Sequence, residues 1–218
     1  MPVPRRSERA RSWRGASFLV SASRLDTVAR VTEHSDRPTQ PRIEPITEFD
    51  GEVAEILATA LTRDGQPLNI FGTLGHHPKL LKRFNLLGGF ILNKGLIPPR
   101  ERELVILRVG ANARAEYEFG QHTVIGRECG LTDTEIAAIA GRDHSWSEGD
   151  QHLLDLADQL SYNDRIDDDT FAALQARWNE AELVELVVTA GFYRLVSGLL
   201  NTFDVPLDDG VPSWPTHI

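Results

Sequence analysis

Helical periodicity dominates this 218-residue chain from Ile46 onward and limits the folds that it can adopt. In residues 48–62 the apolar side chains recur three and four positions apart, as they do along one face of a helix. Runs of alternating apolar and polar residues, which are typical of half-buried strands, are missing from the same region. The sequence therefore predicts an all-α fold without a sheet.

Turn and cap residues set the expected ends of the helices. Gly95 and Gly130 each follow an apolar stripe, where glycine commonly ends a helix. Pro99 suits the first turn of a helix, where the amide needs no partner. We expect helices over residues 48–62, 68–74, 77–92, 98–112, 116–129, 132–140, 147–162, 168–178 and 181–201.

Composition favours a soluble protein in a reducing compartment. Hydrophobic residues make up 41% of the chain and charged residues 25%, as in ordinary globular proteins. We find no apolar run near the roughly 20 residues that a membrane-spanning helix needs, so we expect no membrane partner. A single cysteine, Cys129, excludes an intrachain disulfide and a CxxC motif. We therefore expect a cytoplasmic location.

Charge divides the chain into two parts. Residues 1–42 hold nine arginines against four acidic residues, a balance of +5, so the rest carries −14 within the total of −9. We interpret residues 1–42 as a basic, mostly disordered extension and residues 43–218 as a single helical domain. The extension could be an inert tail or an over-long gene start, a targeting peptide, or an arm for an acidic partner. The acidic body argues against nucleic-acid binding.

Glu118 and His122 are the leading candidates for chemistry. Four positions apart on a helix, they share a face, which Ile125 and Cys129 continue as an apolar stripe. A neighbouring carboxylate favours the imidazolium and burial opposes it, so we expect the pKa of His122 to let it both give and take protons. The alternatives are a structural Glu–His pair and a metal site. The metal site is disfavoured because there is no HExxH motif and no obvious third ligand.

Two residues of the preceding helix could join this pair. If the two helices form a hairpin, Glu103 could come near His122 and orient it, or it could simply stabilise the start of its own helix. Arg108 could hold a substrate carboxylate, neutralise a buried acid or form a surface salt bridge. Cys129 is expected to behave as a small hydrophobic residue rather than as a nucleophile.

The segments GLIPPRERELVILRV and EYEFGQHTVIGRECGLTDTEIAAI resemble the carboxymuconolactone decarboxylase family, and the resemblance extends over roughly residues 46–208. In the alkylhydroperoxidase D (AhpD) branch of that family, a CxxC pair reduces peroxides with a glutamate and a histidine. Glu103 and His122 match that glutamate and histidine, whereas Ala115 and Glu118 occupy the cysteine positions. The resemblance implies an AhpD-like helical fold without thiol peroxidase chemistry.

The decarboxylase branch is similar in placing an acid four residues before the histidine. The resemblance implies a decarboxylase or related lyase of aromatic-ring degradation. It would act on a small carboxylated or lactone metabolite with no cofactor or metal, through His122 as principal acid/base, Glu118 as partner and Glu103 as support. It also implies a homo-trimer or homo-hexamer with sites near subunit contacts. Two alternatives stay open: a redox role for Cys129 with an external thiol, and a non-catalytic helical interaction module.

Overall fold

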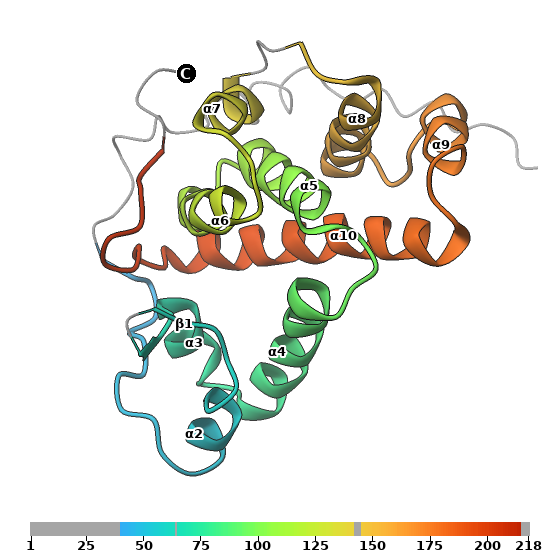
Figure 1. Ribbon diagram of the computed structural model, residues 1–218. Coiled ribbons are helices and arrows are strands. Elements are labelled where there is room, and N and C mark those ends of the chain that lie inside the picture. The colour runs from blue at the N-terminus through green and yellow to red at the C-terminus, as the bar shows by residue number, and fades with distance from the viewer. Residues whose placement is uncertain (1–39, 64, 142–144, 215–218) are drawn as a thin grey trace, which may run out of the picture. The chain divides into compact units, whose positions relative to one another are not determined.

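Helices make up most of the computed structural model, which describes residues 40–63, 65–141 and 145–214 (Figure 1). These residues cluster into a single unit. The predicted extension over residues 1–42 falls almost entirely outside the described residues, so it stays a prediction.

The helices confirm the predicted all-α class. Their bounds are α2 (Gly51–Leu57), α3 (Asn69–Leu74), α4 (Pro78–Asn93), α5 (Pro99–Asn112), α6 (Glu116–Glu128), α7 (Asp133–Gly141), α8 (Glu148–Tyr162), α9 (Asp168–Gln175) and α10 (Glu180–Phe203). Helix α9 is shorter than expected because Asn179 leaves helical geometry to cap α10 through a reciprocal bond with Glu182.

The expectation of no strand was wrong at one place. Strands β1 (Thr62–Arg63) and β2 (Gln66–Pro67) form a small antiparallel ribbon in which Thr62 faces Pro67. Helix α2 ends at Leu57, earlier than predicted, and the chain then leads into this ribbon. Strands of two residues are too short to show alternation, so the pattern could not predict them.

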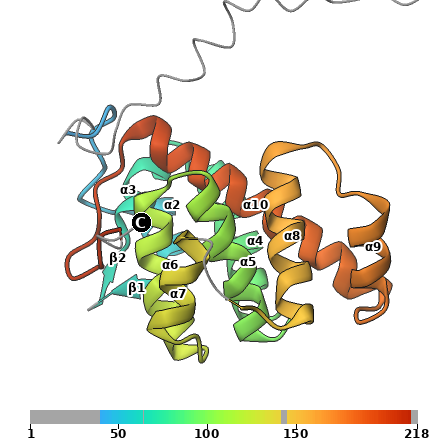
Figure 2. The ribbon, with the colours of Figure 1, turned by 90° about the horizontal axis from the view of Figure 1, so that it is seen from above.

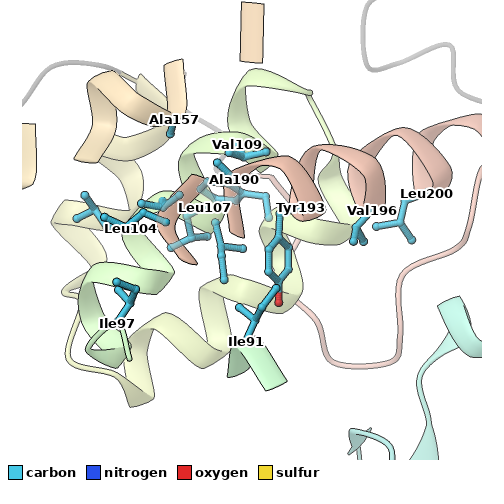
Figure 3. Close-up of a cluster of buried hydrophobic side chains, with 14 of the residues drawn as sticks. Ile91, Ile97, Leu104, Leu107, Val109, Ala157, Ala190, Tyr193, Val196 and Leu200 are labelled. Atoms are coloured by element: carbon cyan, nitrogen blue, oxygen red, sulfur yellow. The ribbon is translucent and has the colours of Figure 1, made fainter. Parts of the chain in front are cut away.

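Helix α5 lies at the centre of the fold and packs against α6, α7, α8 and α10. Its residues 102–110 are all buried, so it is covered on every side. Figure 3 shows Leu104, Leu107 and Val109 of α5 together with Ala190 and Tyr193 of α10. Three charged residues within this stretch, Arg102, Glu103 and Arg108, are therefore buried as well, and each needs a partner.

Helix α10 runs across α5, α6 and α8 (Figures 1 and 2). By length and composition it could cross a membrane, contrary to our expectation that the chain has no such run, but 56% of its apolar window is buried inside the fold. Leu186, Ala190 and Leu200 belong to the core. We therefore regard α10 as a core helix.

The segment after α10 ties distant parts of the chain together. Asp208 accepts hydrogen bonds from the Asn69 backbone amide (2.8 Å), the Tyr117 hydroxyl (2.5 Å) and the Gln121 side chain. Further along, the Trp214 ring lies 4.7 Å from the ring of Phe119, centroid to centroid. These contacts fix α3 and the C-terminal segment against α6, the helix that carries His122.

Candidate active site

His122 lies between two carboxylates. Its Nδ1 donates to Glu103 Oε2 over 2.5 Å, and its Nε2 lies 3.1 Å from Glu118 Oε1. Glu103 comes from α5 and the other two from α6, helices that pack directly on each other. All three are buried, with residue exposures of 0% for Glu103, 4% for Glu118 and 5% for His122. The structure thus brings together the three residues that the sequence singled out.

Arg102 completes this cluster, and the sequence reasoning missed it. Its Nε donates to Glu103 Oε1 over 2.9 Å, and its Nη1 donates to the Leu92 carbonyl over 2.9 Å. A weaker contact joins Nη2 to Cys129 Sγ at 3.8 Å. Each Glu103 oxygen therefore meets a cationic group, as a buried carboxylate requires.

The charge of His122 follows from these neighbours. Burial lowers its pKa, but the charges of Glu103 and Glu118, together with the hydrogen bond to Glu103, raise it more, from 6.5 to about 10. At neutral pH the ring is an imidazolium. From the sequence, we expected one carboxylate beside His122 and a ring that gives and takes protons near neutral pH. The structure places two carboxylates there, so the pKa of His122 lies higher than expected.

Glu118 is the less satisfied of the two acids. Its Oε1 is within ion-pair distance of His122, yet this buried oxygen has no well-aligned hydrogen bond from any described residue. A buried acceptor without a donor is costly, so it stands ready to accept from a bound molecule.

A cavity of about 470 Å³ lies beside this cluster. Its wall includes Glu118, His122 and Arg102. Most of the rest is apolar and comes from α3, α4, α6, α10 and the loop before α3. It includes Leu68, Ile70, Phe71, Phe84, Leu92, Ile125, Phe192 and Val196. The site is thus a mostly apolar pocket with the Glu118–His122 pair on one wall.

Tyr193 of α10 is a second wall residue that the sequence did not single out. Its ring meets the His122 ring edge-on, with 4.9 Å between the centroids. Burial, with the charges of Glu118 and Glu103, raises the pKa of Tyr193 well above its usual value, so the phenol keeps its proton. In the sequence it is one of several apolar and aromatic residues of α10, and nothing local distinguishes it.

Arg108 does not belong to the site. Its Nε and Nη2 donate to Asp158 over 2.6 and 2.8 Å, and its Nη1 donates to the Ile139 carbonyl over 2.6 Å. It is not among the residues that line the cavity. The interpretation of Arg108 as a substrate-binding residue is therefore withdrawn, because its guanidinium joins α5 to α7 and α8 instead.

Cys129 caps the end of α6 and lies outside the cavity wall. Burial raises the pKa of the thiol, and the charge of Glu103 adds to this. A protonated thiol is a poor nucleophile. Among residues 40–63, 65–141 and 145–214, no cluster of three or more histidine, cysteine or acidic side chains has the arrangement of a metal site.

The match to a known family covers the part of the chain that carries this cluster. Residues 78–153, from the start of α4 into α8, match the model of the carboxymuconolactone decarboxylase family. A comparison with curated proteins gives no match.

Solved structures share the fold at low sequence identity. A peroxidase-related protein from a Silicibacter species is 12% identical with a TM-score of 0.70, covering 82% of this chain and 97% of that one. The AhpD core protein from Ralstonia eutropha is 19% identical, with a TM-score of 0.61 and coverages of 72% and 83%. The debrominase Bmp8, in complex with 2,3,4-tribromopyrrole, is 17% identical, with a TM-score of 0.57 and coverages of 72% and 82%. Together with the family match, they confirm the resemblance to the carboxymuconolactone decarboxylase family and the AhpD-like helical fold.

Proposed function

We propose that this chain is an enzyme that moves a proton on a small organic molecule bound in the cavity. Glu118 and His122 share that proton, and Glu103 holds the imidazole. The observation that carries the proposal is the buried Glu118 oxygen at the cavity wall, which has an imidazolium beside it and no aligned hydrogen bond.

We assign a separate role to each residue of the cluster. Glu118, which lies beside the His122 imidazolium on the cavity wall, takes the proton from the substrate and later returns it. Glu103 fixes the orientation of His122, and Arg102 fixes Glu103, much as a carboxylate orients the histidine of a catalytic triad.

The reaction class is a narrower proposal. A lyase that decarboxylates a carboxylated metabolite would release carbon dioxide, leave the electron pair on carbon and replace the lost group with a proton from the Glu118–His122 pair. A lactone substrate would instead lose a proton from the carbon beside its carbonyl to Glu118 and regain one at another carbon. The bound bromopyrrole of the debrominase supports a small cyclic ligand for this fold.

The cavity also bears on the two other interpretations. A non-catalytic helical module would pack His122 into a closed interface, whereas about 470 Å³ of space lies beside it. A thiol-dependent reaction would need a reactive sulfur in the site, whereas Cys129 lies off the cavity wall with a raised pKa. The structure therefore gives no support to a non-catalytic module or to a thiol-dependent reaction.

The test is a screen of the purified chain against carboxymuconolactone, β-keto acids and lactones in D2O. Carbon dioxide release and deuterium incorporation are the readouts. For any compound that is turned over, His122→Gln and Glu118→Gln should each lower the rate by about 10²-fold or more, whereas Glu101→Gln on α5 should not change it. Undiminished turnover in both site variants would contradict the proposal.

We also propose that the chain assembles into a homo-oligomer, as the family resemblance implies, either a trimer or a hexamer. Exposed apolar side chains at helical spacing on α10 support this: Val184 (64% exposed), Val188 (42%) and Leu195 (57%). Helix α4 exposes Leu86 (66%) and Phe90 (46%) in the same way. Light scattering coupled to size-exclusion chromatography measures the mass, and a monomer at micromolar concentration would contradict the assembly.

A further inference from the structure

The cations on the cavity wall are already engaged by protein groups. Each of the three Arg102 nitrogens contacts an acceptor, namely Glu103, the Leu92 carbonyl or the Cys129 sulfur. Both ring nitrogens of His122 face carboxylates. An anionic ligand would therefore meet cationic groups that already face protein acceptors.

Arg63 is a further cation beside the wall residue Gln121; one of its nitrogens is engaged, while its buried Nε has no hydrogen-bond partner among the described residues. Arg63 reaches over from β1, where its Nη2 donates to Gln121 Oε1 over 2.9 Å, and it is not part of the cavity wall. The amide nitrogen of Gln121 is in turn held by Asp208. Arg63 and Gln121 thus form a polar network at the edge of the cavity, where Gln121 is part of the lining, and this network holds β1 and the C-terminal segment to α6.

One charged group of the wall has an oxygen without an aligned donor. Glu118 Oε1 is buried and lies 3.1 Å from His122 Nε2 without an aligned hydrogen bond, and Glu128 adds a second, exposed acidic side chain to the lining. A carboxylate placed here would be repelled by Glu118 at short range. A ligand hydroxyl or N–H group, in contrast, would supply the hydrogen bond that Glu118 lacks.

The remaining wall is suited to a flat apolar ring. Phe84 of α4 and Phe192 of α10 line the cavity, and their ring centroids lie 5.0 Å apart. Gly88 and Gly89 leave part of α4 without side chains, which widens the space between these helices. Tyr193 adds a neutral O–H group near His122.

We infer that this site binds an uncharged cyclic molecule that donates an O–H or N–H group to Glu118, and that it discriminates against carboxylates of the same shape. The inference rests on the proposed function and narrows it. It favours a neutral ring that carries a hydroxyl or N–H group, such as a hydroxylated lactone, over a carboxylated metabolite.

Three ligands of one shape test this on the full chain at pH 7 by isothermal titration calorimetry: 2-naphthol, 2-methoxynaphthalene and 2-naphthoate. Naphthol is neutral and donates, the methyl ether is neutral without a donor, and naphthoate is an anion. Naphthol should bind at least about tenfold more tightly than each of the others, a difference of ~1.4 kcal/mol. In Glu118→Gln, naphthoate should gain at least about tenfold relative to naphthol, while the ether binds as before.

Equal or tighter binding of naphthoate to the unmodified chain would overturn the inference. So would the failure of all three ligands to bind, or naphthoate binding that Arg63→Gln abolishes, because a carboxylate would then be held by Arg63. None of these measurements depends on turnover. If the ligand preference is wrong but His122→Gln loses turnover, the inference about the ligand fails and the proposed function stands. If the ligand preference is as expected but His122→Gln keeps full turnover, only the proposed function is contradicted.

Discussion

Glu103 offers the sharpest test of how the site is held together. It is fully buried and accepts hydrogen bonds from Arg102 at 2.9 Å and from His122 at 2.5 Å. Glu103→Gln keeps the shape of the side chain but removes its charge. Two cationic groups inside the fold then lose the carboxylate that compensates both of them.

The expected cost follows from this burial. Breaking a buried ion pair by removing one partner destabilises a protein by about 3–5 kcal/mol. His122 can release its proton in response, but Arg102 cannot, because a guanidinium stays charged. We therefore expect Glu103→Gln to lower the free energy of unfolding by about 3–5 kcal/mol, a large share of the roughly 5–15 kcal/mol typical of a domain.

Urea unfolding at pH 7, followed by far-UV circular dichroism at one protein concentration, measures this difference. Glu101→Gln is the matched control, two residues away on α5. Its partner Arg177, 2.9 Å away, has a side chain that is 42% exposed, so this pair contributes at most about 1 kcal/mol. A loss below about 1 kcal/mol in Glu103→Gln as well would refute the reasoning.

The same variant changes the response to pH. Because the pKa of His122 is raised from 6.5 to about 10, its contribution to stability is complete below 6.5 and is lost as the pH rises through about 10. Between these values the free energy of unfolding should fall by up to about 1.4 kcal/mol per pH unit. Glu103→Gln removes one cause of the raised pKa and should flatten this slope. Equal slopes in both proteins would contradict the assignment.

Three further changes probe other parts of the structure. Gly120→Ala places a Cβ against the Pro212 carbonyl and 2.7 Å from Val211 Cγ1. This variant should lower the free energy of unfolding, measured by urea titration, by about 1–3 kcal/mol. The control Gly89→Ala, whose Cβ would have nothing within 4 Å, should not destabilise the chain. Arg108→Gln should lower stability by about 1–3 kcal/mol by leaving Asp158 without its guanidinium, while turnover per folded molecule, once an active compound is found, stays unchanged. Cys129→Ser should retain turnover within about twofold, since a thiol of raised pKa outside the cavity takes no part in the chemistry; a much larger loss would revive the redox interpretation.

Local patterns predicted the helices and part of the site. Glu118 and His122 are four residues apart on one helix, so their contact is a consequence of helical geometry alone. Pro99 and Gly130 mark helix ends through their own backbone preferences. Such features depend on neighbours in sequence and can be recognised without a structure.

Neighbours in sequence could not show whether Arg102 or Arg108 belongs to the site. Arg102 and Arg108 both lie on α5, whose faces are all buried, so no polar face shows which one turns toward His122. Only the packing of α4 and α8 decides it: Arg102 meets the Leu92 carbonyl, and Arg108 meets Asp158. Tyr193 is likewise placed by the crossing of α10, about 70 residues further along the chain.

The protonation state of His122 is the most direct test of the central claim, that this residue is an imidazolium held between two carboxylates. Nuclear magnetic resonance of the chain with ¹⁵N-labelled histidine reports both ring nitrogens, and the signals lost in His122→Gln identify the residue among the seven histidines. We predict that both nitrogens carry protons at pH 7 and that the ring titrates near pH 10. A neutral ring at pH 7, with only one nitrogen protonated, would contradict the account.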